Sequence, residues 1–324
     1  MSAKWKLRFI EYLASKKSFR DRALKKEFDA VIMADPDGKI IEYASWWPDW
    51  MRGLAGGAGF VLDGGGWNKL IIPDSGGSIG SMSFSKYKPG KIDVECVPSF
   101  VPLALMGIEL KKDSVVFTEK GIGGGPDLIR MWTTPAMRRV ETPMKGGGVI
   151  FEAEYPIWRK VVIGLDDTDS SVKGATFNTA LQIASIIDKG LTDVKFIRLT
   201  ISLNWPKNPD KTTNNASSAL VFAVKPGKEE ELVREFQRLV TKYTISNDTG
   251  MAIMTKIQAP ESIKAYAMKV KTVRVGISEA YKAAEEAGVR TIPITGERGL
   301  IGALSAVGLV DDMEKAITPI ENAS

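Results

Sequence analysis

The stretch Val161–Thr176, VVIGLDDTDSSVKGAT, decides how the rest of the chain is interpreted. Its first five residues form a short apolar run, which is typical of a buried strand. Three aspartates and several hydroxyl residues follow at once. From Thr176 onward the apolar residues recur at helical spacing, at Phe177, Ala180, Leu181, Ala184 and Ile187. The stretch therefore predicts a strand, an acidic loop and the start of a helix.

The acidic loop is the first candidate site. Its carboxylates, Asp166, Asp167 and Asp169, would repel one another unless a cation lay between them. Oxygen ligands of this kind suit Mg²⁺, which proteins usually hold with one or two carboxylates and the phosphates of a substrate. The predicted helix start near Thr176 would offer free backbone N–H groups to a phosphate. A turn and N-cap cluster is the alternative, but a cap needs one carboxylate, so three favour a metal–phosphate site.

The composition narrows the chemistry further. The chain has 324 residues with one cysteine, Cys96, and no histidine. These counts exclude a catalytic Ser-His-Asp triad, a Cys-His pair, a histidine zinc site and a disulfide framework. Carboxylates, hydroxyls, Lys, Arg and a hard metal remain, and these are the groups that phosphoryl transfer uses. The formal net charge of +5 suits an anionic partner without identifying it.

Neither a membrane span nor a secretory signal is expected. No apolar run approaches the ~20 residues that cross a bilayer, and no signal-peptide pattern opens the sequence. We therefore expect a cytoplasmic protein with no membrane partner. The length allows two domains, each with its own core. We place the boundary at the glycine-rich segment 146–156, which gives domains at 1–150 and 151–324.

The first domain is expected to carry a basic helix and then glycine-punctuated strands. Residues 4–26 could contact RNA or protein, although a docked amphipathic helix is the plainer interpretation. GIGGGPD at Gly121–Asp127 could wrap a phosphate as a nest, or form a turn. DPDGK at Asp35–Lys39 predicts a hairpin turn. Four tryptophans could stack bases but suit core packing better, namely Trp46, Trp47, Trp50 and Trp67.

The second domain predicts a βαββαβ order, which is that of a ferredoxin-like unit, followed by an α/β extension. The class is therefore α+β, with a mostly-β first domain. The predicted elements are a strand at 160–165, a helix at 176–188, strands at 194–202 and 217–224, a helix at 228–242, a strand at 250–257, a helix at 261–269, a strand at 271–275, a helix at 278–288 between Ser278 and Gly288, and a strand at 290–294.

Several ordered blocks resemble the ATP-using, kinase-like domain of the archaeal synthetases that install agmatinylcytidine in an isoleucine tRNA. The first is GLDDTDS followed by GAT, within the stretch quoted above. The N-terminal half, with GIGGG before this module, resembles most the methanogenesis marker protein 11 family. The later blocks are FIRLTISLNWP at Phe196–Pro206, KTTNNAS at Lys211–Ser217, NDTGMAI at Asn247–Ile253 and GERGLIGALSAVG at Gly296–Gly308.

The resemblance, together with the acidic loop, assigns roles to residues. ATP and Mg²⁺ are the expected cofactors, with metal on Asp166, Asp167 and Asp169 and catalysis by Asp167 and Thr176. Thr176 aligns with a threonine that the synthetases use as a phosphorylation site, but Ala175 replaces the cysteine before it. Thr213 and Asn214 likewise replace an Arg-Gly pair. The expected nucleotide-binding residues are Thr168, Ser170, Lys173, Gly174, Lys211, Asn215, Arg298 and Gly299. Gly299 and Gly302 lie about one helical turn apart, which suits either close packing or a backbone approach to a ligand.

Three functions follow as hypotheses. The first is an ATP- and Mg²⁺-dependent phosphoryl-transfer or activation protein associated with methanogenesis, acting in maturation or modification of methyl-coenzyme M reductase, whose subunits would be partners. The second is an RNA-modifying enzyme like the synthetases. The synthetases' zinc-ribbon region has no counterpart here, whereas the basic segment and the tryptophans favour RNA. The third is a non-catalytic nucleotide-binding scaffold, which the replacements at Ala175 and 213–214 would permit.

Overall fold

The computed structural model describes residues 29–35, 37, 40–46, 82–87, 89–91, 103–122, 137–212 and 215–320. The chain divides into two compact units, Met1–Trp158 and Arg159–Ser324. Their boundary lies inside one long strand, β8 (Gly148–Asp166), rather than in a linker. Gly146 and Gly147, with φ of +98° and +90°, make the tight turn into this strand. A boundary at 150–151 would therefore cut β8 near its beginning.

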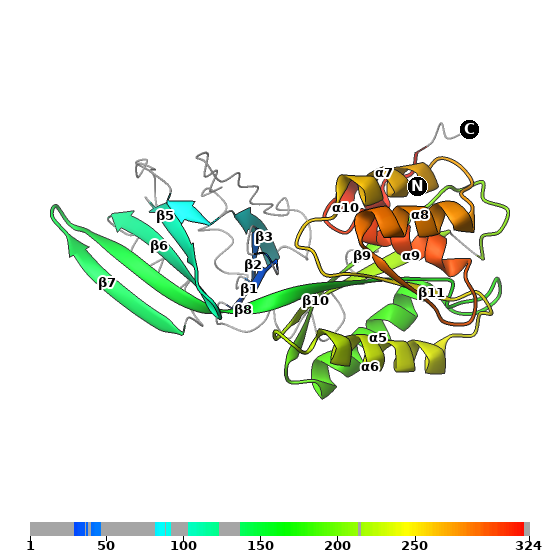
Figure 1. Cartoon of the computed structure of the whole chain (residues 1–324), viewed down its shortest axis with the longest axis horizontal. Coiled ribbons are helices and arrows are strands. Elements are labelled where there is room, and N and C mark those ends of the chain that lie inside the picture. The colour runs from blue at the N-terminus through cyan, green and yellow to red at the C-terminus, as the bar shows by residue number, and fades with distance from the viewer. Residues whose placement is uncertain are drawn as a thin grey trace. The chain divides into compact units, whose positions relative to one another are not determined.

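The described part of the first unit is made of β-strands (Figure 1). They pair in the order β3-β2-β1-β8-β6-β5-β4, and β7 also pairs with β8. Only the contact between β1 and β8 is parallel. The strands are β1 (Asp29–Ala34), β2 (Ile41–Trp46), β3 (Met82–Tyr87), β4 (Gly90–Lys91), β5 (Leu103–Leu110), β6 (Ser114–Ile122), β7 (Arg138–Met144) and the first part of β8.

Alternating side chains of these strands build the core of the first unit. Phe117 and Tyr155 meet edge-to-face with ring centroids 5.8 Å apart, and both belong to one buried apolar cluster. The hairpin predicted at Asp35–Lys39 is confirmed, because β1 and β2 pair antiparallel on either side of it. Several predictions for this unit fall outside the described residues. They concern the helix at 4–26, three of the tryptophans (Trp47, Trp50 and Trp67) and the residues of GIGGGPD after Ile122.

The second unit is a mixed α/β structure. Its strands pair in the order β9-β10-β8-β11-β12, and every neighbouring pair is antiparallel. The elements after β8 are α5 (Thr176–Gly190), β9 (Val194–Leu203), β10 (Ala216–Val224), α6 (Glu229–Tyr243), β11 (Gly250–Met254), α7 (Glu261–Val270), α8 (Ile277–Ala287), β12 (Arg290–Pro293), α9 (Gly299–Gly308) and α10 (Met313–Ile317).

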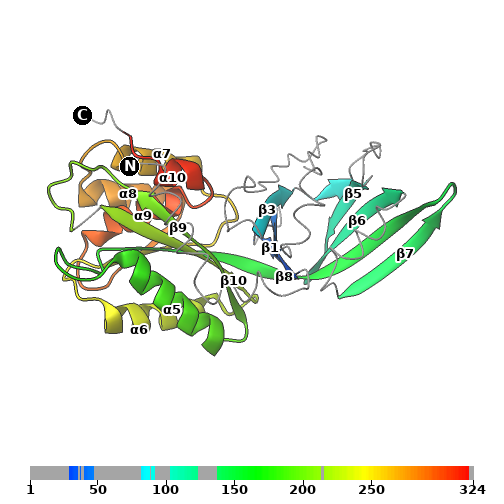
Figure 2. The same cartoon turned by 180° about the vertical axis from the view of Figure 1, so that it is seen from behind.

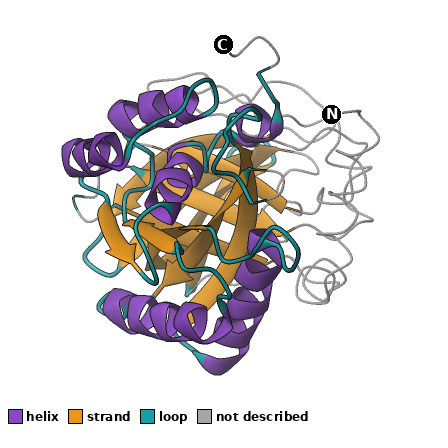
Figure 3. Ribbon diagram, turned by 90° about the vertical axis from the view of Figure 1, so that its right-hand side faces the viewer, coloured by secondary structure: helices purple, strands orange, loops and turns teal. Residues whose placement is uncertain are grey.

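Helices cover both faces of this sheet. Helices α5 and α6 lie on one face and α7–α10 on the other (Figures 1 and 2), and the view along the strands shows the same layers (Figure 3). The buried helix α9 approaches the sheet closely because Gly164 on β8 has no Cβ. A Cβ at this position would lie 2.8 Å from the Val307 side chain. Among the described residues, no helix is long and apolar enough to cross a membrane.

Most predicted elements of the second half are found within a few residues of their expected limits, with two exceptions. The strand predicted at 271–275 is wrong, because the chain turns there between α7 and α8. Lys271 is buried instead, and its ammonium donates hydrogen bonds to the carbonyls of Leu203 and Ala316. Ser278 is not the N-cap of α8, which begins after Gly276. Gly288 ends that helix in the predicted left-handed conformation, with φ of 65°.

A buried ionic cluster ties the C-terminal segment to the sheet. Lys160 on β8 and Arg198 on β9 each reach the same oxygen of Asp311, at 2.9 Å. Arg198 also donates to the Val310 carbonyl at 2.7 Å. Burying two cations beside one carboxylate is costly unless the geometry is good. The loop before α10 is therefore held in a single position above the sheet.

Candidate functional site

The acidic loop opens into a cleft on the α9 side of the second unit. Its walls come from the end of β8, the loop between β9 and β10, the connection between α7 and α8, and the start of α9. Asp166, Asp167 and Arg298 line one part of the cleft. Three valines, Val270, Val273 and Val275, also line the cleft, and we call them the valine wall. The cleft thus combines charge with an apolar surface.

Asp166 and Asp167 stand at the point where β8 ends. Asp167 has a φ of +53°, a left-handed conformation that turns the chain sharply out of the strand. Burial, followed by the charge of Asp167, raises the pKa of Asp166 well above its usual value. Burial also raises the pKa of Asp167, and the Arg298 guanidinium opposes that rise. The two carboxylates are therefore short of positive charge, which is the condition that a bound cation relieves.

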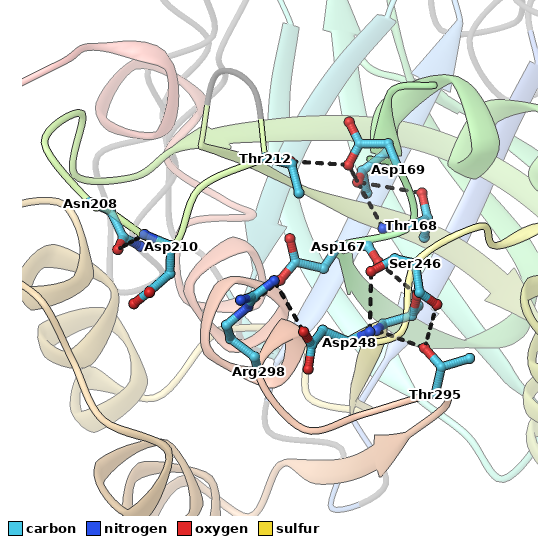
Figure 4. Close-up of polar contacts among 12 residues, drawn as sticks. Asp167, Thr168, Asp169, Asn208, Asp210, Thr212, Ser246, Asp248, Thr295 and Arg298 are labelled. Atoms are coloured by element: carbon cyan, nitrogen blue, oxygen red, sulfur yellow. Dashed lines mark hydrogen bonds and ion pairs between the residues drawn. The ribbon is translucent and has the colours of Figure 1, made fainter. Parts of the chain in front are cut away.

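Arg298 bridges two carboxylates at the edge of the cleft (Figure 4). Its Nε lies 3.5 Å from Oδ2 of Asp167, and its Nη2 lies 3.1 Å from Oδ2 of Asp248. Asp248 belongs to the loop before β11, so three segments distant in sequence converge here. The structure thus brings Arg298 and Asp167 together, as the sequence predicted for one site, and adds Asp248.

Asp169 turns in a different direction from Asp166 and Asp167. Its Oδ1 accepts a hydrogen bond from the Thr212 hydroxyl at 3.3 Å (Figure 4). The same oxygen accepts a second hydrogen bond from the Thr176 hydroxyl at 3.4 Å. Burial raises its pKa, and these two hydroxyls oppose the rise. Neither Asp169 nor Thr176 is among the described residues that line the cleft, and Thr176 is only 4% exposed. In this conformation the Thr176 hydroxyl faces Asp169 and not the cleft.

Asp166 and Asp167 fit a magnesium ion only if the ligand completes the coordination. Within the described ranges, no group of three or more acidic, cysteine or histidine side chains is arranged to hold a metal ion. The sequence predicted three metal carboxylates, and the structure turns two toward the cleft. Two are sufficient where phosphate oxygens and water supply the other ligands, as is usual for Mg²⁺. The donor set therefore suits a metal that arrives with a phosphate-bearing ligand.

Several other predicted nucleotide-binding residues have local structural roles. Ser170 and Lys173 close a turn through three hydrogen bonds, of 2.9, 3.1 and 3.3 Å. Gly174 follows this turn with a φ of +93°. The buried backbone N–H of Thr168 donates to the Thr176 hydroxyl at 3.2 Å. The N–H of Gly299 is already bonded to the Asp248 carbonyl at 2.8 Å.

Lys211 and Asn215, by contrast, do line the cleft. The ammonium of Lys211 donates to the Pro206 carbonyl at 2.6 Å, and the Asn215 amide donates to the Trp205 carbonyl at 2.6 Å. Asn215 has a φ of +49°, a left-handed conformation that non-glycine residues seldom adopt. Thr213 and Asn214, at which the sequence departs from the synthetases, lie outside the described residues.

Sequence reasoning did not single out several residues of this site. Asp248 was quoted within the block NDTGMAI, which was the available signal. Asn204 likewise lies within the quoted block FIRLTISLNWP. The others had no signal beyond ordinary loop composition, and they are Asn208, Asp210 and Arg274 together with the three valines. Arg274 pairs with Asp210 at 2.7 Å across the cleft lining.

Gly302 explains how the buried helix α9 and the acidic loop fit together. A Cβ on Gly302 would lie 2.6 Å from Cγ of Asp166, and the three nearest atoms all belong to the Asp166 side chain. The carboxylate therefore occupies the space that any larger residue would take. Of the two interpretations of this glycine pair, Gly302 serves the close approach of a carboxylate, and Gly299 serves backbone packing.

Part of the second unit matches a known protein family. Residues 162–232 match the model of the TiaS TCKD domain. The chain is 34% identical over 229 residues to the uncharacterized protein MJ0921 of Methanocaldococcus jannaschii, covering 69% of this chain and 76% of that protein. The tRNA 2-agmatinylcytidine synthetase TiaS of Pyrococcus horikoshii is 30% identical over 150 residues, and that of Pyrobaculum neutrophilum is 36% identical over 154 residues.

These synthetases are matched over part of their length only. The matched region is 45% of this chain and 35% of the Pyrococcus horikoshii protein, so the chain spans about a third of those relatives. A crystal structure of TiaS in complex with tRNA and ATP is similar with a TM-score of 0.42 and 26% identity, covering 46% of this chain and 36% of that one. The predicted TiaS-like domain is confirmed, while the likeness to the methanogenesis marker family stays a prediction.

Proposed function

The chain belongs to the same family as the uncharacterized protein MJ0921 of Methanocaldococcus jannaschii, and we propose that it is an ATP-dependent, RNA-modifying enzyme. Its cleft would bind ATP with Mg²⁺ and activate a group on an RNA. The proposal adopts the second of the three hypotheses drawn from the sequence. The association with methanogenesis, and reductase subunits as partners, stay predictions from sequence resemblance.

The main support for the proposal is that the residues matched to a known domain overlap with the residues that line the cleft. The residues matched to the TiaS TCKD domain, 162–232, include both carboxylates that face the cleft and most of the loop that forms its wall. The relatives with a named activity are tRNA-modifying synthetases. The antiparallel order β9-β10-β8-β11 also supports the ferredoxin-like, kinase-like arrangement inferred from the βαββαβ sequence of elements.

The chemistry of the cleft suggests an orientation for the nucleotide. Its phosphates would lie against Asp166, Asp167 and Arg298, and the nucleoside against the valine wall. Asp166 and Asp167 would hold Mg²⁺, which supplies neutralisation of phosphate charge. Arg298 would donate to the phosphate oxygens, because a guanidinium matches them with two parallel hydrogen bonds. The valine wall would exclude water from one side of the base.

The acceptor is proposed to come from outside the chain. Thr176 is buried against Asp169 and does not line the cleft, so this conformation presents no hydroxyl of Thr176 to a bound phosphate. A basic chain with a formal charge of +5 attracts an RNA acceptor more readily than an acidic one would. The role of the chain's residues is then to bind and orient ATP and to leave the cleft mouth open to the RNA.

Calorimetric titration of ATP in the presence of Mg²⁺ tests the nucleotide site. We expect saturable binding to the wild type and a loss of at least about tenfold in Asp167→Asn, which is about 1.4 kcal/mol. The control is Glu285→Gln, an exposed carboxylate change on α8, which should bind as the wild type does. Equal binding by the wild type and Asp167→Asn would remove the cleft from the proposal.

Incubation with ATP and total archaeal tRNA tests the RNA part. We expect an ATP-dependent change in the mass of one RNA species, and RNA binding that weakens steeply as salt rises. Copurification with reductase subunits without RNA would instead favour the methanogenesis hypothesis. Binding of ATP with no change in any RNA or protein would favour the scaffold.

A further inference from the structure

The pairing of Arg298 with two carboxylates points to a control on metal binding. We propose that Arg298 is a built-in counter-ion of Asp167, shared with Asp248, and that a phosphate-bearing ligand must draw Arg298 away before Asp167 can hold a metal. Asp248 is then a positioning residue, which keeps Arg298 at the site after it leaves Asp167. The inference rests on the proposed ATP site and adds an order to it, in which the nucleotide makes metal binding favourable.

The two ion pairs of Arg298 are unequal. The contact with Asp248 is shorter, at 3.1 Å, than the contact with Asp167, at 3.5 Å. The Arg298 and Asp248 side chains are 41% and 39% exposed, whereas that of Asp167 is 14% exposed. The guanidinium therefore has room on its solvent side, while Asp167 is confined. Arg298 can leave Asp167 and keep its hold on Asp248.

The backbone of the loops that carry Arg298 and Asp248 is closely packed, so it has little room to move. The N–H of Gly299 donates to the Asp248 carbonyl at 2.8 Å. A Cβ on Gly296 would lie 2.5 Å from the Asn247 carbonyl oxygen, and one on Gly250 would lie 2.5 Å from the carbonyl carbon of Gly299. The loops that carry Arg298 and Asp248 are thus pressed backbone to backbone. A rearrangement at this point is therefore one of side chains, such as that of Arg298.

The charge balance of the site explains how the Arg298 side chain affects metal binding. At rest, one guanidinium neutralises part of the charge of Asp166, Asp167 and Asp248, and so it competes with a free metal ion for Asp167. Triphosphate oxygens compete for Arg298 in turn, because they accept two parallel hydrogen bonds from it. Metal and nucleotide should therefore bind with positive coupling, each strengthening the binding of the other by the same factor.

Mn²⁺ as a spin probe for Mg²⁺ separates the two effects. Free Mn²⁺ would be measured by electron paramagnetic resonance, with and without a non-hydrolysable ATP analogue. We expect Arg298→Met to bind Mn²⁺ alone roughly three- to tenfold more tightly than the wild type, and the analogue about tenfold more weakly. The matched control is Arg290→Met, which removes a surface arginine paired with Glu230 and should change neither affinity.

Asp248→Asn should act in the opposite direction on the free metal. With its second partner gone, Arg298 would stay on Asp167, and Mn²⁺ alone should bind more weakly than to the wild type. Tighter Mn²⁺ binding in Asp248→Asn would overturn the positioning role. Weaker binding of both Mn²⁺ and analogue to a folded Arg298→Met, or unchanged Mn²⁺ binding, would overturn the counter-ion role.

The same titrations distinguish failure of this inference from failure of the ATP proposal. If no variant binds the analogue but Arg298→Met still binds Mn²⁺ more tightly, the counter-ion role stands and the ATP site is wrong. If the wild type binds the analogue and the metal with no coupling between them, the ATP site stands and the inference is wrong. If no protein binds either ligand, both are wrong.

Discussion

Replacing Gly302 by alanine is the sharpest test of the site, because it adds one methyl group at the back of the cleft. The new Cβ would lie 2.6 Å from Cγ of Asp166 and 3.2 Å from its Cβ. Ordinary contacts between carbon atoms begin near ~3.5 Å, so the carboxylate must move by about 1 Å or more. All three of the nearest atoms belong to the Asp166 side chain, which can rotate without moving the backbone.

The stability change should be small and the binding change large. Overpacking a core typically costs about 1–3 kcal/mol, and replacing glycine by alanine inside a helix returns about 1 kcal/mol. A net loss below about 2 kcal/mol is therefore expected. A metal ligand displaced by about 1 Å cannot keep its coordination distance, so the affinity for ATP with Mg²⁺ should fall at least about tenfold, or about 1.4 kcal/mol.

Calorimetry for binding and chemical denaturation for stability should be measured on the same preparations. Gly164→Ala is the matched contrast, because its Cβ would meet the Ala303 backbone of α9 and should reduce stability more than Gly302→Ala does. Gly190→Ala, with nothing within 4 Å of the new Cβ, should leave the affinity unchanged and should raise stability by no more than about 1 kcal/mol. A folded Gly302→Ala with the wild-type affinity would refute the assignment of Asp166 to the site.

Three further predictions concern the framework of the second unit. Asp311→Asn should lower the free energy of unfolding by about 3–5 kcal/mol in denaturant titrations, because it leaves the buried charges of Lys160 and Arg198 without their shared carboxylate; a loss below about 1 kcal/mol would contradict this. Burial lowers the pKa of Lys271 to about 8, and the unfolded chain keeps that proton to about pH 10.4. Unfolding should therefore become harder from about pH 8 upward, by up to about 3 kcal/mol, and the rise should be absent from the matched titration of Lys271→Met. Thr176→Val should cost about 1–3 kcal/mol in thermal unfolding by removing a buried hydrogen bond to Asp169, whereas Thr176→Ser should cost clearly less.

The second half of the fold could be predicted because each element has a local signal. Helix α6 carries an apolar stripe and three glutamates in its first turn, and α8 ends at a left-handed glycine. The strand predicted at 271–275 was wrong because a local signal cannot account for a contact with distant segments. A short apolar run was taken for a strand, but Lys271 is anchored by two carbonyls from distant segments, and no sequence pattern encodes that contact.

The orientation of the three aspartates is harder to predict than their presence. Asp167 adopts a left-handed φ of +53°, a conformation that non-glycine residues seldom adopt. This single backbone angle helps send Asp166 and Asp167 into the cleft, while Asp169 turns toward two threonines. From the spacing of residues in the sequence, the loop is interpreted as one acidic cluster. The structure divides it into a cleft-facing pair and a carboxylate that accepts a hydrogen bond from Thr176, the first residue of α5.

The glycines of α9 show most clearly what spacing alone leaves undecided. Gly299 and Gly302 lie one turn apart, so either a ligand or a packed neighbour could have required them. Gly302 is needed because the Asp166 side chain occupies the position of its missing Cβ, and Gly299 because the backbone of the Asp248 loop does. Both glycines therefore affect the site indirectly, through the packing of α9. They let α9 press against the acidic loop, and that contact brings Arg298, the residue before the helix, within reach of Asp167. A larger residue at either position would move a charged group before it touched any ligand, which is why binding should respond to Gly302→Ala more strongly than stability does.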